Sequence, residues 1–368
     1  MSINRDIKDR ITLQDIAKEL GVSIGTVDRA IHNRPDVSSD TRSKVLKLIE
    51  DYNYKTDKVA RSLSLRSKKI RIGVICQSEA KFFWDNVKNG IKAAESELSD
   101  FGLEIIYREM DPNRKLEIIL QDMDELIDMN VDAIALVPVD DPAVKEKIDE
   151  AFEKGIPVAT FNDDIDGSKR IFYVGPQIRQ TGRIAGELMG NFLHNRGKVF
   201  TISLELTSLE YKERLEGFKE VMQEQFSNVK KIGGFTYNYK NMGSDIIGLL
   251  KNLLENLGEV DGIYDITGGC LNDVANIVKN AEKLRGVVLV GHEVWSGVKE
   301  SIIDGTIKAC ISQDPYSQGY FIIKLLFDFL NDGKRPAFER MYTRLDIVMR
   351  ENLINQANVI NPYYIHTK

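Results

Sequence analysis

The residues of this sequence that could perform acid–base chemistry include two adjacent carboxylates, Asp163 and Asp164. Paired carboxylates can serve as the acid and the base of a hydrolase. An Asp-Asp pair in a turn is more often solvated, and no nucleophile elbow, phosphate-binding loop or zinc motif accompanies it in the sequence. Gly268-Gly269 lacks the GxGxxG spacing of a dinucleotide site. The sequence therefore does not predict an enzyme.

The cysteines and histidines offer no metal site. The three cysteines and four histidines are scattered, without the short spacings that bind zinc or build a disulfide framework. Cys76 and Cys310 each end an apolar run, so we expect both to be small buried hydrophobes. The sequence predicts neither a metal nor a cofactor.

The residues from 70 onward alternate strand-like apolar runs with amphipathic helices. The expected strands are 70–76, 103–108, 133–137, 158–161, 199–204, 232–237, 262–266, 287–292 and 309–313. The expected helices include 83–100, 116–129, 181–195, 211–225, 246–256 and 316–330. Such alternation is typical of parallel sheets with right-handed crossovers. Because the strands exceed one comfortable sheet, we expect two α/β lobes, with a crossing point near Arg170–Gly175.

The segments that follow the expected strands are candidates for ligand binding. In open parallel sheets, ligands bind beyond the carboxyl ends of the strands, and two facing lobes would bring these ends together in a cleft. The segments are 77–84, 138–141, 162–164, 267–270, 293–295 and 313–316.

The first 55 residues predict three short helices and no strand. Thr12 precedes an apolar helical spacing and Asp15 follows it by three residues, much like a capping box. Gly21 should end this helix, and Ser23 should cap a second helix. The buried face of the second helix is expected to hold Val27, Ala30 and Ile31. A short turn with a glycine between two helices is typical of a helix-turn-helix, although any three-helix bundle shares this pattern.

The third helix should begin at Ser38 or Ser39 and run to about residue 53. Its expected buried residues are Val45, Leu46, Leu48 and Ile49. The next segment is rich in lysine and arginine and has too few apolar residues for a core, which predicts a linker with one or two helical turns. We therefore expect a helix-turn-helix domain over 1–55, a hinge helix and linker over 56–69, and an effector-binding domain of two α/β lobes over 70–368.

Charge is unevenly distributed along the chain. Residues 1–69 hold 15 Lys and Arg against 10 Asp and Glu, a net +5, which leaves −11 for the remainder of a chain whose net charge is −6. A basic head favours a polyanionic partner, although so mild a bias is more often a solvated face. The polar residues 1–10 and the lack of an 18-residue apolar run predict no secretory signal, no membrane helix and a cytoplasmic location.

Residues 12–29 resemble the DNA-binding head of the LacI/GalR family of bacterial repressors. The matching frame is Ile16-Ala17, Gly21-Val22-Ser23, Thr26-Val27 and Arg29, and it continues through Val37-Ser38, Thr41-Arg42, Tyr54 and residues 59–63. The body resembles periplasmic sugar-binding proteins, especially those of the ribose-binding type. The resemblance covers nearly the whole chain. It implies an all-α helix-turn-helix head plus a two-lobed, periplasmic-binding-protein-like α/β domain with two parallel sheets.

The resemblance implies DNA contacts at the start of the second helix. Ile24 and Gly25 would face base edges, and Arg29 could donate a bidentate pair to guanine. Ser23 and Thr26 would hydrogen-bond phosphates. Further contacts are expected from Thr12, His32, Ala60 and Leu63. For His32, an exposed loop histidine is the alternative.

Residues 59–63 match the hinge helix of the family. Leu63 corresponds to the leucine that intercalates in the minor groove. Thr56 stands where proline is common and Asp57 where asparagine is usual. So short a helix should order only on DNA, in a homodimer that reads a pseudo-palindromic operator. A ligand that alters lobe closure would then alter how the two hinge helices meet.

The resemblance also implies ligand-binding residues. These are Phe82, Phe83, Asn162, Asp163, Arg214, Thr267, Glu293, Trp295 and Gln313. Phe82 and Phe83 match an aromatic pair that stacks on a sugar ring, although one of them could instead pack in the core. Arg214 matches an arginine that binds ligand hydroxyls, and Gln313 matches another ligand position. Trp295 could be a lid or a core residue.

Other positions depart from the ribose-binding pattern. Asn162 replaces an aspartate, Asp163 an arginine, Thr267 an asparagine, Glu293 an aspartate and Ala80 another polar residue. Carboxylates, amides and rings still suit a polyhydroxylated ligand, so we expect a sugar or sugar derivative.

Together these implications predict a DNA-binding transcription regulator that is not an enzyme and whose operator affinity is controlled by a small molecule. A repressor is favoured by the habit of the family. The alternative is a sugar-binding module that does not act on DNA, but that role needs export and leaves the head unexplained. The expected partners are operator DNA, the effector and a second copy of the chain, with no membrane.

Overall fold

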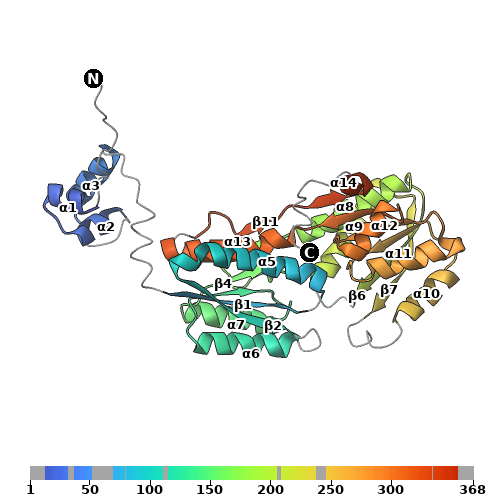
Figure 1. The fold of residues 1–368 in the computed structure, drawn as a ribbon, viewed down its shortest axis with the longest axis horizontal. Coiled ribbons are helices and arrows are strands. Elements are labelled where there is room, and N and C mark those ends of the chain that lie inside the picture. The colour runs from blue at the N-terminus through green and yellow to red at the C-terminus, as the bar shows by residue number, and fades with distance from the viewer. Residues whose placement is uncertain are drawn as a thin grey trace, which may run out of the picture. The chain divides into compact units, whose positions relative to one another are not determined.

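A computed structural model describes residues 13–31, 37–51, 69–78, 80–110, 115–204, 209–237, 246–333 and 335–354. The chain divides into two compact units, Met1–Ser67 and Lys68–Lys368. Figure 1 labels the helices and strands of both units.

The described residues of the first unit form three helices. They are α1 (Leu13–Leu20), α2 (Ile24–Ile31) and α3 (Ser39–Asp51). Gly21 follows α1 with φ +63°, as expected of a helix-ending glycine. The Ser23 hydroxyl accepts the Thr26 amide at 3.1 Å and caps α2. Ser38 caps α3 in the same way, because its hydroxyl accepts the Thr41 amide at 3.1 Å.

All three helices contribute to the core of this unit. The buried residues are Ile16, Ala17, Val27, Ala30 and Val45, with Ile31, Leu48 and Ile49 packed against them. The prediction is wrong for Leu46, which is 47% exposed. Successive residues of a helix point about 100° apart, so Leu46 turns away from the face on which Val45 lies.

The second unit contains two six-stranded sheets. The first sheet has the order β11-β5-β4-β3-β1-β2, and all of its strand pairs are parallel. Its strands are β1 (Ile70–Gln77), β2 (Leu103–Met110), β3 (Ala133–Leu136), β4 (Val158–Phe161), β5 (Tyr173–Gly175) and β11 (Arg340–Tyr342). Every residue of β3 and β4 is buried, which explains why both read as almost continuous apolar runs.

The second sheet has the order β12-β10-β9-β8-β6-β7. Its strands are β6 (Gly197–Leu204), β7 (Val229–Tyr237), β8 (Gly262–Asp265), β9 (Val288–His292), β10 (Ile307–Ser312) and β12 (Asp346–Val348). A parallel sheet was predicted, but its edge strand β12 runs antiparallel to β10. The chain reaches β12 directly from β11 of the first sheet, without the helical crossover that a parallel neighbour would need.

Helices cover both faces of each sheet (Figure 1). On the first sheet, α5 and α13 lie together on one face, and α6 and α7 lie on the other. On the second sheet, α8 and α9 pack together on one face, while α10, α11 and α12 enclose a separate apolar core. The helices are α5 (Lys81–Leu98), α6 (Lys115–Asp128), α7 (Pro142–Glu153), α8 (Ile178–Phe192), α9 (Leu209–Gln225), α10 (Ile246–Asn256), α11 (Leu271–Asn280), α12 (Ser296–Ile303), α13 (Pro315–Asp332) and α14 (Arg350–Ile354).

Two helix pairs approach each other closely at glycines. A Cβ atom at Gly319 of α13 would clash with the Val87 carbonyl of α5. A Cβ atom at Gly182 of α8 would clash with the Arg214 carbonyl of α9. The second contact fixes the backbone position from which the Arg214 side chain extends.

Each sheet and its helices form one lobe, and we call the lobes first and second after their sheets. The chain passes between them at three places. The first lies after β5 and before α8, close to the crossing point predicted at Arg170–Gly175. The others join β10 to α13 and β11 to β12. Cys76 and Cys310 are fully buried, as predicted. No helix within the described ranges is long and apolar enough to cross a membrane.

Candidate functional site

The candidate DNA contacts of the head gather at the start of α2. The hydroxyls of Ser23 and Thr26 lie 2.8 Å apart, and Arg29 Nη2 donates to Thr26 Oγ1 at 3.4 Å. Ile24 is exposed although it is a large apolar residue, and Gly25 is exposed beside it. One helix end therefore presents hydroxyls, a guanidinium and an apolar side chain together. The candidates Thr12, His32, Ala60 and Leu63 lie outside the described residues.

Strand ends of the second unit position the candidate ligand residues. Asn162 follows β4 in the left-handed region, with φ +63°. Its carbonyl accepts the Tyr173 hydroxyl at 2.9 Å, and its Nδ2 donates to Gln318 Oε1 at 3.3 Å. Gln318 Nε2 donates in turn to the carbonyl of Gln313 at 3.0 Å, and Thr343 Oγ1 donates to that same carbonyl at 3.0 Å. Gln318 thus links the strand end that holds Asn162 to the one that holds Gln313.

Arg214 is the charged centre of the second lobe. Its side chain is buried, and Nη1 donates to the carbonyl of Ile266 at 2.9 Å. Nε donates to Thr181 Oγ1 at 3.3 Å, and Nη2 forms an ion pair with Glu210 Oε1 at 2.5 Å. Burial works against its positive charge, but Glu210 together with Tyr264, Glu293 and Tyr211 outweighs burial and raises the pKa of Arg214.

Glu293 follows β9 in the left-handed region, with φ +62°. Burial raises the pKa of its carboxyl to about 8, and the lowering effects of Arg214 and of Gln313 N–H groups do not offset this. A non-glycine residue held at positive φ at a strand end is often part of a functional site, because the backbone strain needs compensation elsewhere.

Thr267 belongs to a hydrogen-bonded turn after β8. Its amide and hydroxyl both donate to Asp265 Oδ1 at 3.0 Å, and the Gly268 amide donates to the same oxygen at 3.2 Å. The Tyr237 hydroxyl lies 3.1 Å from Thr267 Oγ1. Burial raises the pKa of Asp265 to about 6 against these hydrogen bonds.

The aromatic candidates have different surroundings. Phe82 of α5 stacks on Trp295 at the start of α12, with ring centroids 5.2 Å apart, so this ring pair joins the two lobes. Phe83 is buried in the core of the first lobe and packs edge-on against Trp84. Phe83 is therefore the phenylalanine that packs in the core. Trp295, predicted to be either a lid or a core residue, is half-buried against Phe82.

Asp163 and Asp164 are both buried, so the expectation of a solvated turn is wrong. Arg170 Nε and Nη2 donate to the two oxygens of Asp164 at 2.5 and 2.7 Å. The Thr160 hydroxyl donates at 2.7 Å and Arg340 Nε at 3.3 Å. These donors supply the compensation that lets a carboxylate be buried.

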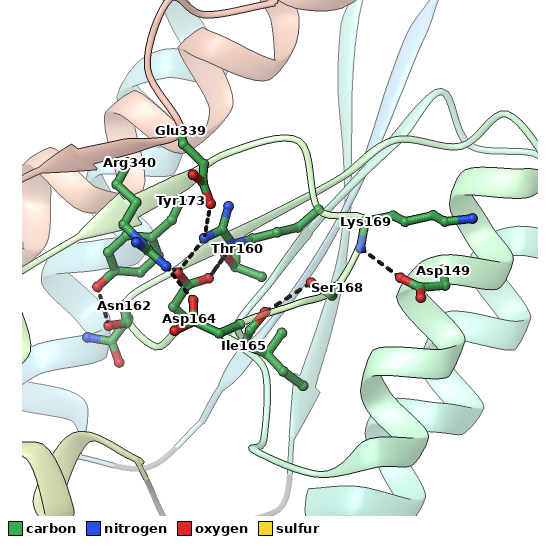
Figure 2. A network of polar contacts seen from close by, with 12 residues as sticks. Asp149, Thr160, Asn162, Asp164, Ile165, Ser168, Lys169, Tyr173, Glu339 and Arg340 are labelled. Atoms are coloured by element: carbon green, nitrogen blue, oxygen red, sulfur yellow. Dashed lines mark hydrogen bonds and ion pairs between the residues drawn. The ribbon is translucent and has the colours of Figure 1, made fainter.

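Asp164 therefore has a structural role. Burial alone would raise its pKa, but the Arg170 guanidinium, the Thr160 hydroxyl and the Ile165 amide together outweigh burial and lower it. Figure 2 shows Arg340 approaching the Asp164 carboxylate from strand β11, at the third crossing between the lobes. A carboxylate held in this way is not available as a catalytic base.

Three residues near the candidates were not identified from the sequence: Glu210, Asp265 and Gln318. Glu210 lies one helical turn before Arg214, and this spacing of opposite charges is a signal that the sequence does contain. Asp265 ends a strand, whereas only residues after the strand were considered. Gln318 lies inside a helix, and nothing in its local sequence marks it.

These residues form a continuous group, which we call the strand-end cluster: Asn162, Asp163, Glu210, Arg214, Asp265, Thr267, Glu293, Gln313 and Gln318, with Phe82 and Trp295 as its aromatic members. Asp163 joins it through Tyr173, on which both Asp163 and Glu210 act electrostatically. Its polar groups can hold hydroxyl or amine groups, while its rings can cover an apolar face. Two cavities of about 350 and 510 Å³ lie elsewhere in the second lobe, away from the cluster. Within the described residues, no group of three His, Cys, Asp or Glu side chains could hold a metal ion.

Two family models match the chain. The one described as bacterial regulatory proteins, lacI family, matches residues 12–57, and the periplasmic binding protein domain matches residues 72–335. Catabolite control protein A of Priestia megaterium is 25% identical over 232 residues, which cover 62% of this chain and 67% of that protein. The match thus spans about two thirds of that relative.

Sugar-binding proteins are also similar. The D-ribose/D-allose-binding protein of Pseudomonas aeruginosa is 23% identical over 283 residues, covering 74% of this chain and 86% of that protein. Among solved structures, an ABC transporter solute-binding protein of Burkholderia graminis in complex with D-arabinose has a TM-score of 0.69 at 22% identity. It covers 78% of this chain and 98% of that chain, which shows a common fold.

Proposed function

We propose that this chain is a transcription regulator controlled by a small molecule. It belongs to the periplasmic binding protein family through residues 72–335 and to the bacterial lacI family of regulatory proteins through residues 12–57. The family resemblance and the fold class predicted from the sequence are confirmed by these matches and by the two-sheet architecture. A sugar-binding module that does not act on DNA is less well supported, because it leaves the regulatory head without a role.

The head supports DNA binding through the group at the start of α2. Ser23 and Thr26 hydroxyls can position the helix on phosphates, and Arg29 can read a guanine in the major groove. We infer that the protein is a homodimeric repressor, since a twofold-symmetric protein matches a pseudo-palindromic operator. Such a protein works in the cytoplasm. The domain limits of 55 and 69, and the hinge role of Leu63, belong to the same proposal.

The single observation that carries the effector site is the chain of contacts across the strand-end cluster. Hydrogen bonds run from Asn162 through Gln318 to Gln313 and on to Glu293, and Glu293 interacts electrostatically with Arg214. A small molecule bound to these groups would contact both lobes and so favour one closure of the lobes over another. We infer that the effector is polyhydroxylated, a sugar or sugar derivative. The relatives reported above are regulators and sugar-binding proteins, and we infer no catalytic activity.

A thermal-shift screen of the purified full chain tests this site. A ligand that binds the folded state adds RT ln(1 + [L]/Kd) to the free energy of unfolding and so raises the melting temperature. We expect one class of sugar, polyol or nucleoside to raise it and to change operator affinity. Arg214→Ala should abolish the shift, whereas Arg183→Ala, which removes an arginine paired with Glu220 and Glu224 on the same helix pair, should retain it. An equal shift in both variants would place the effector elsewhere.

A further inference from the structure

Arg214 has more carboxyl groups around it than one guanidinium can pair with. Glu210 already forms an ion pair with Arg214 at 2.5 Å. Glu293 and Asp265 interact electrostatically with the same guanidinium. Asp163 and Glu210 act together on the Tyr173 hydroxyl, which brings a fourth carboxyl group into the cluster. One buried cation therefore interacts with three acidic side chains, and a fourth belongs to the same cluster.

The described arginines of the first lobe are not paired with the acidic groups of the strand-end cluster. Arg170 pairs with Asp164 and Glu339, and Arg340 pairs with Asp164 and Asp166. Both guanidiniums are already paired within that network of three carboxylates, so the excess of acidic groups in the strand-end cluster remains.

Acceptors outnumber donors among the buried atoms of the cluster that lack a hydrogen-bond partner. Within the part of the chain that the structure describes, the acceptors include Glu293 Oε1, Gln313 Oε1 and Asp265 Oδ2. The donors are Trp295 Nε1 and Arg214 Nη2, and the second of these already forms the ion pair with Glu210. Glu293 and Gln313 are only 6% and 4% exposed, so water does not readily reach these oxygens. A buried acceptor without a donor is costly, and a ligand that complements this site must therefore be rich in donors.

We propose that the effector is a cation: a polyhydroxylated molecule with a protonated amine, such as an amino sugar or aminocyclitol, whose ammonium group binds at Glu293 and Gln313. This inference rests on the proposed function, because it names the class of molecule that the same site takes. An ammonium group brings three donors and no acceptor, and its charge offsets the carboxyl groups that Arg214 leaves unbalanced. A phosphate or carboxylate would add acceptors and negative charge to a site whose acidic groups already outnumber its one guanidinium.

Glu293 gives the proposal a second readout. Because burial raises its pKa to about 8, most of its carboxyl groups hold a proton at pH 7. A neighbouring ammonium favours the ionised form, so binding of the amine should release a proton. The release appears in calorimetry as a binding enthalpy that depends on the ionisation enthalpy of the buffer.

The test compares matched molecules on the full chain by thermal shift and calorimetry. The probes are a set of amino sugars and aminocyclitols, their parent sugars and cyclitols, and the phosphates of those parents. We expect at least one amine to bind about tenfold more tightly than its parent, with proton release, and the phosphate to bind more weakly still. The proposal is overturned if no amine binds, or if a parent or phosphate binds as tightly as its amine.

Charge-changing variants test the residues. Glu293→Gln keeps the shape of the side chain and should lose both the amine preference and the proton release. Glu210→Gln leaves the charge of Arg214 uncompensated and should shift the preference toward the phosphate. Glu187→Gln, on the exposed face of α8, is the control and should bind the amine as the unsubstituted protein does. An unchanged preference in both cluster variants contradicts the proposal even if one of them is less stable.

Selection of DNA from a random pool, run on the same preparation, separates this inference from the proposed function. If one DNA sequence is enriched and the effector proves neutral or anionic, the proposed regulator function stands and the cationic effector is rejected. Amine binding without DNA enrichment would retain the cation site and reject the regulator.

Discussion

Glu293 should make the unliganded protein less stable as the pH rises through neutrality. The perturbation is Glu293→Gln, which replaces a titrating carboxyl by an amide that stays neutral at every pH. In the folded state the carboxyl has a pKa of about 8, because it is buried, whereas an exposed glutamate has an ordinary value of 4.5.

The sign and size follow from proton linkage. Between these two values the folded state binds a proton at Glu293 that the unfolded chain has lost, so stability falls as pH rises. One pH unit inside this window costs about 1.4 kcal/mol. The interval from pH 6.5 to 7.5 is informative because the raised pKa of Asp265, about 6, lies below it. Buried His292, whose pKa is held well below its ordinary value by burial, contributes equally to both proteins.

Urea denaturation followed by tryptophan fluorescence measures this effect. Both tryptophans, Trp84 and Trp295, lie in the second unit, so the signal reports its unfolding and not that of the head. The parent protein should lose about 1.4 kcal/mol more than Glu293→Gln over this pH interval. If the two proteins show the same pH slope, Glu293 titrates normally and the argument from its burial is refuted.

Three further predictions concern packing, buried charge and DNA reading. Gly319→Ala places a methyl group against the Val87 carbonyl and should cost about 1–3 kcal/mol in urea unfolding, whereas Gly258→Ala, in open space, should cost little. Arg170→Ala leaves Asp164 buried without its main counter-charge and should cost about 3–5 kcal/mol, and a loss below 1 kcal/mol in the same assay would deny that role. Arg29→Ala should relax the preference for guanine at one operator position by about 1–3 kcal/mol, as measured by competition binding, and an unchanged preference would limit Arg29 to phosphate contact.

The fold could be predicted largely because its signals are local. Alternation of apolar runs and amphipathic segments marks most strands and helices, and caps such as Ser23 and Gly21 mark the helix ends. The antiparallel β12 could not be predicted, because its three residues carry no pattern and the sheet edge decides its direction. The exposed Leu46 shows that an apolar residue beside a buried face need not belong to it.

The candidate site could be predicted in part, because strand ends can be located from sequence. Asn162, Glu293 and Gln313 follow strands, and the structure connects them through Gln318 and Gln313 N–H groups. Such long-range links depend on how the two sheets are placed, so no local pattern reveals them. The burial of Asp164 is a similar case, since Arg340 lies 176 positions away in the chain. Glu210, by contrast, could have been found from its helical spacing to Arg214.

An operator titration tests the central claim most directly. DNA enriched by the full chain from a random duplex pool is labelled and titrated by fluorescence anisotropy, with and without the molecule that raises the melting temperature. We predict that a twofold-symmetric sequence is enriched, that it binds at least about 1,000-fold more tightly than its shuffled version, and that the molecule changes this affinity. Equal affinity for the enriched and shuffled DNA, or an operator affinity that the molecule leaves unchanged, would contradict a regulator controlled through the strand-end cluster.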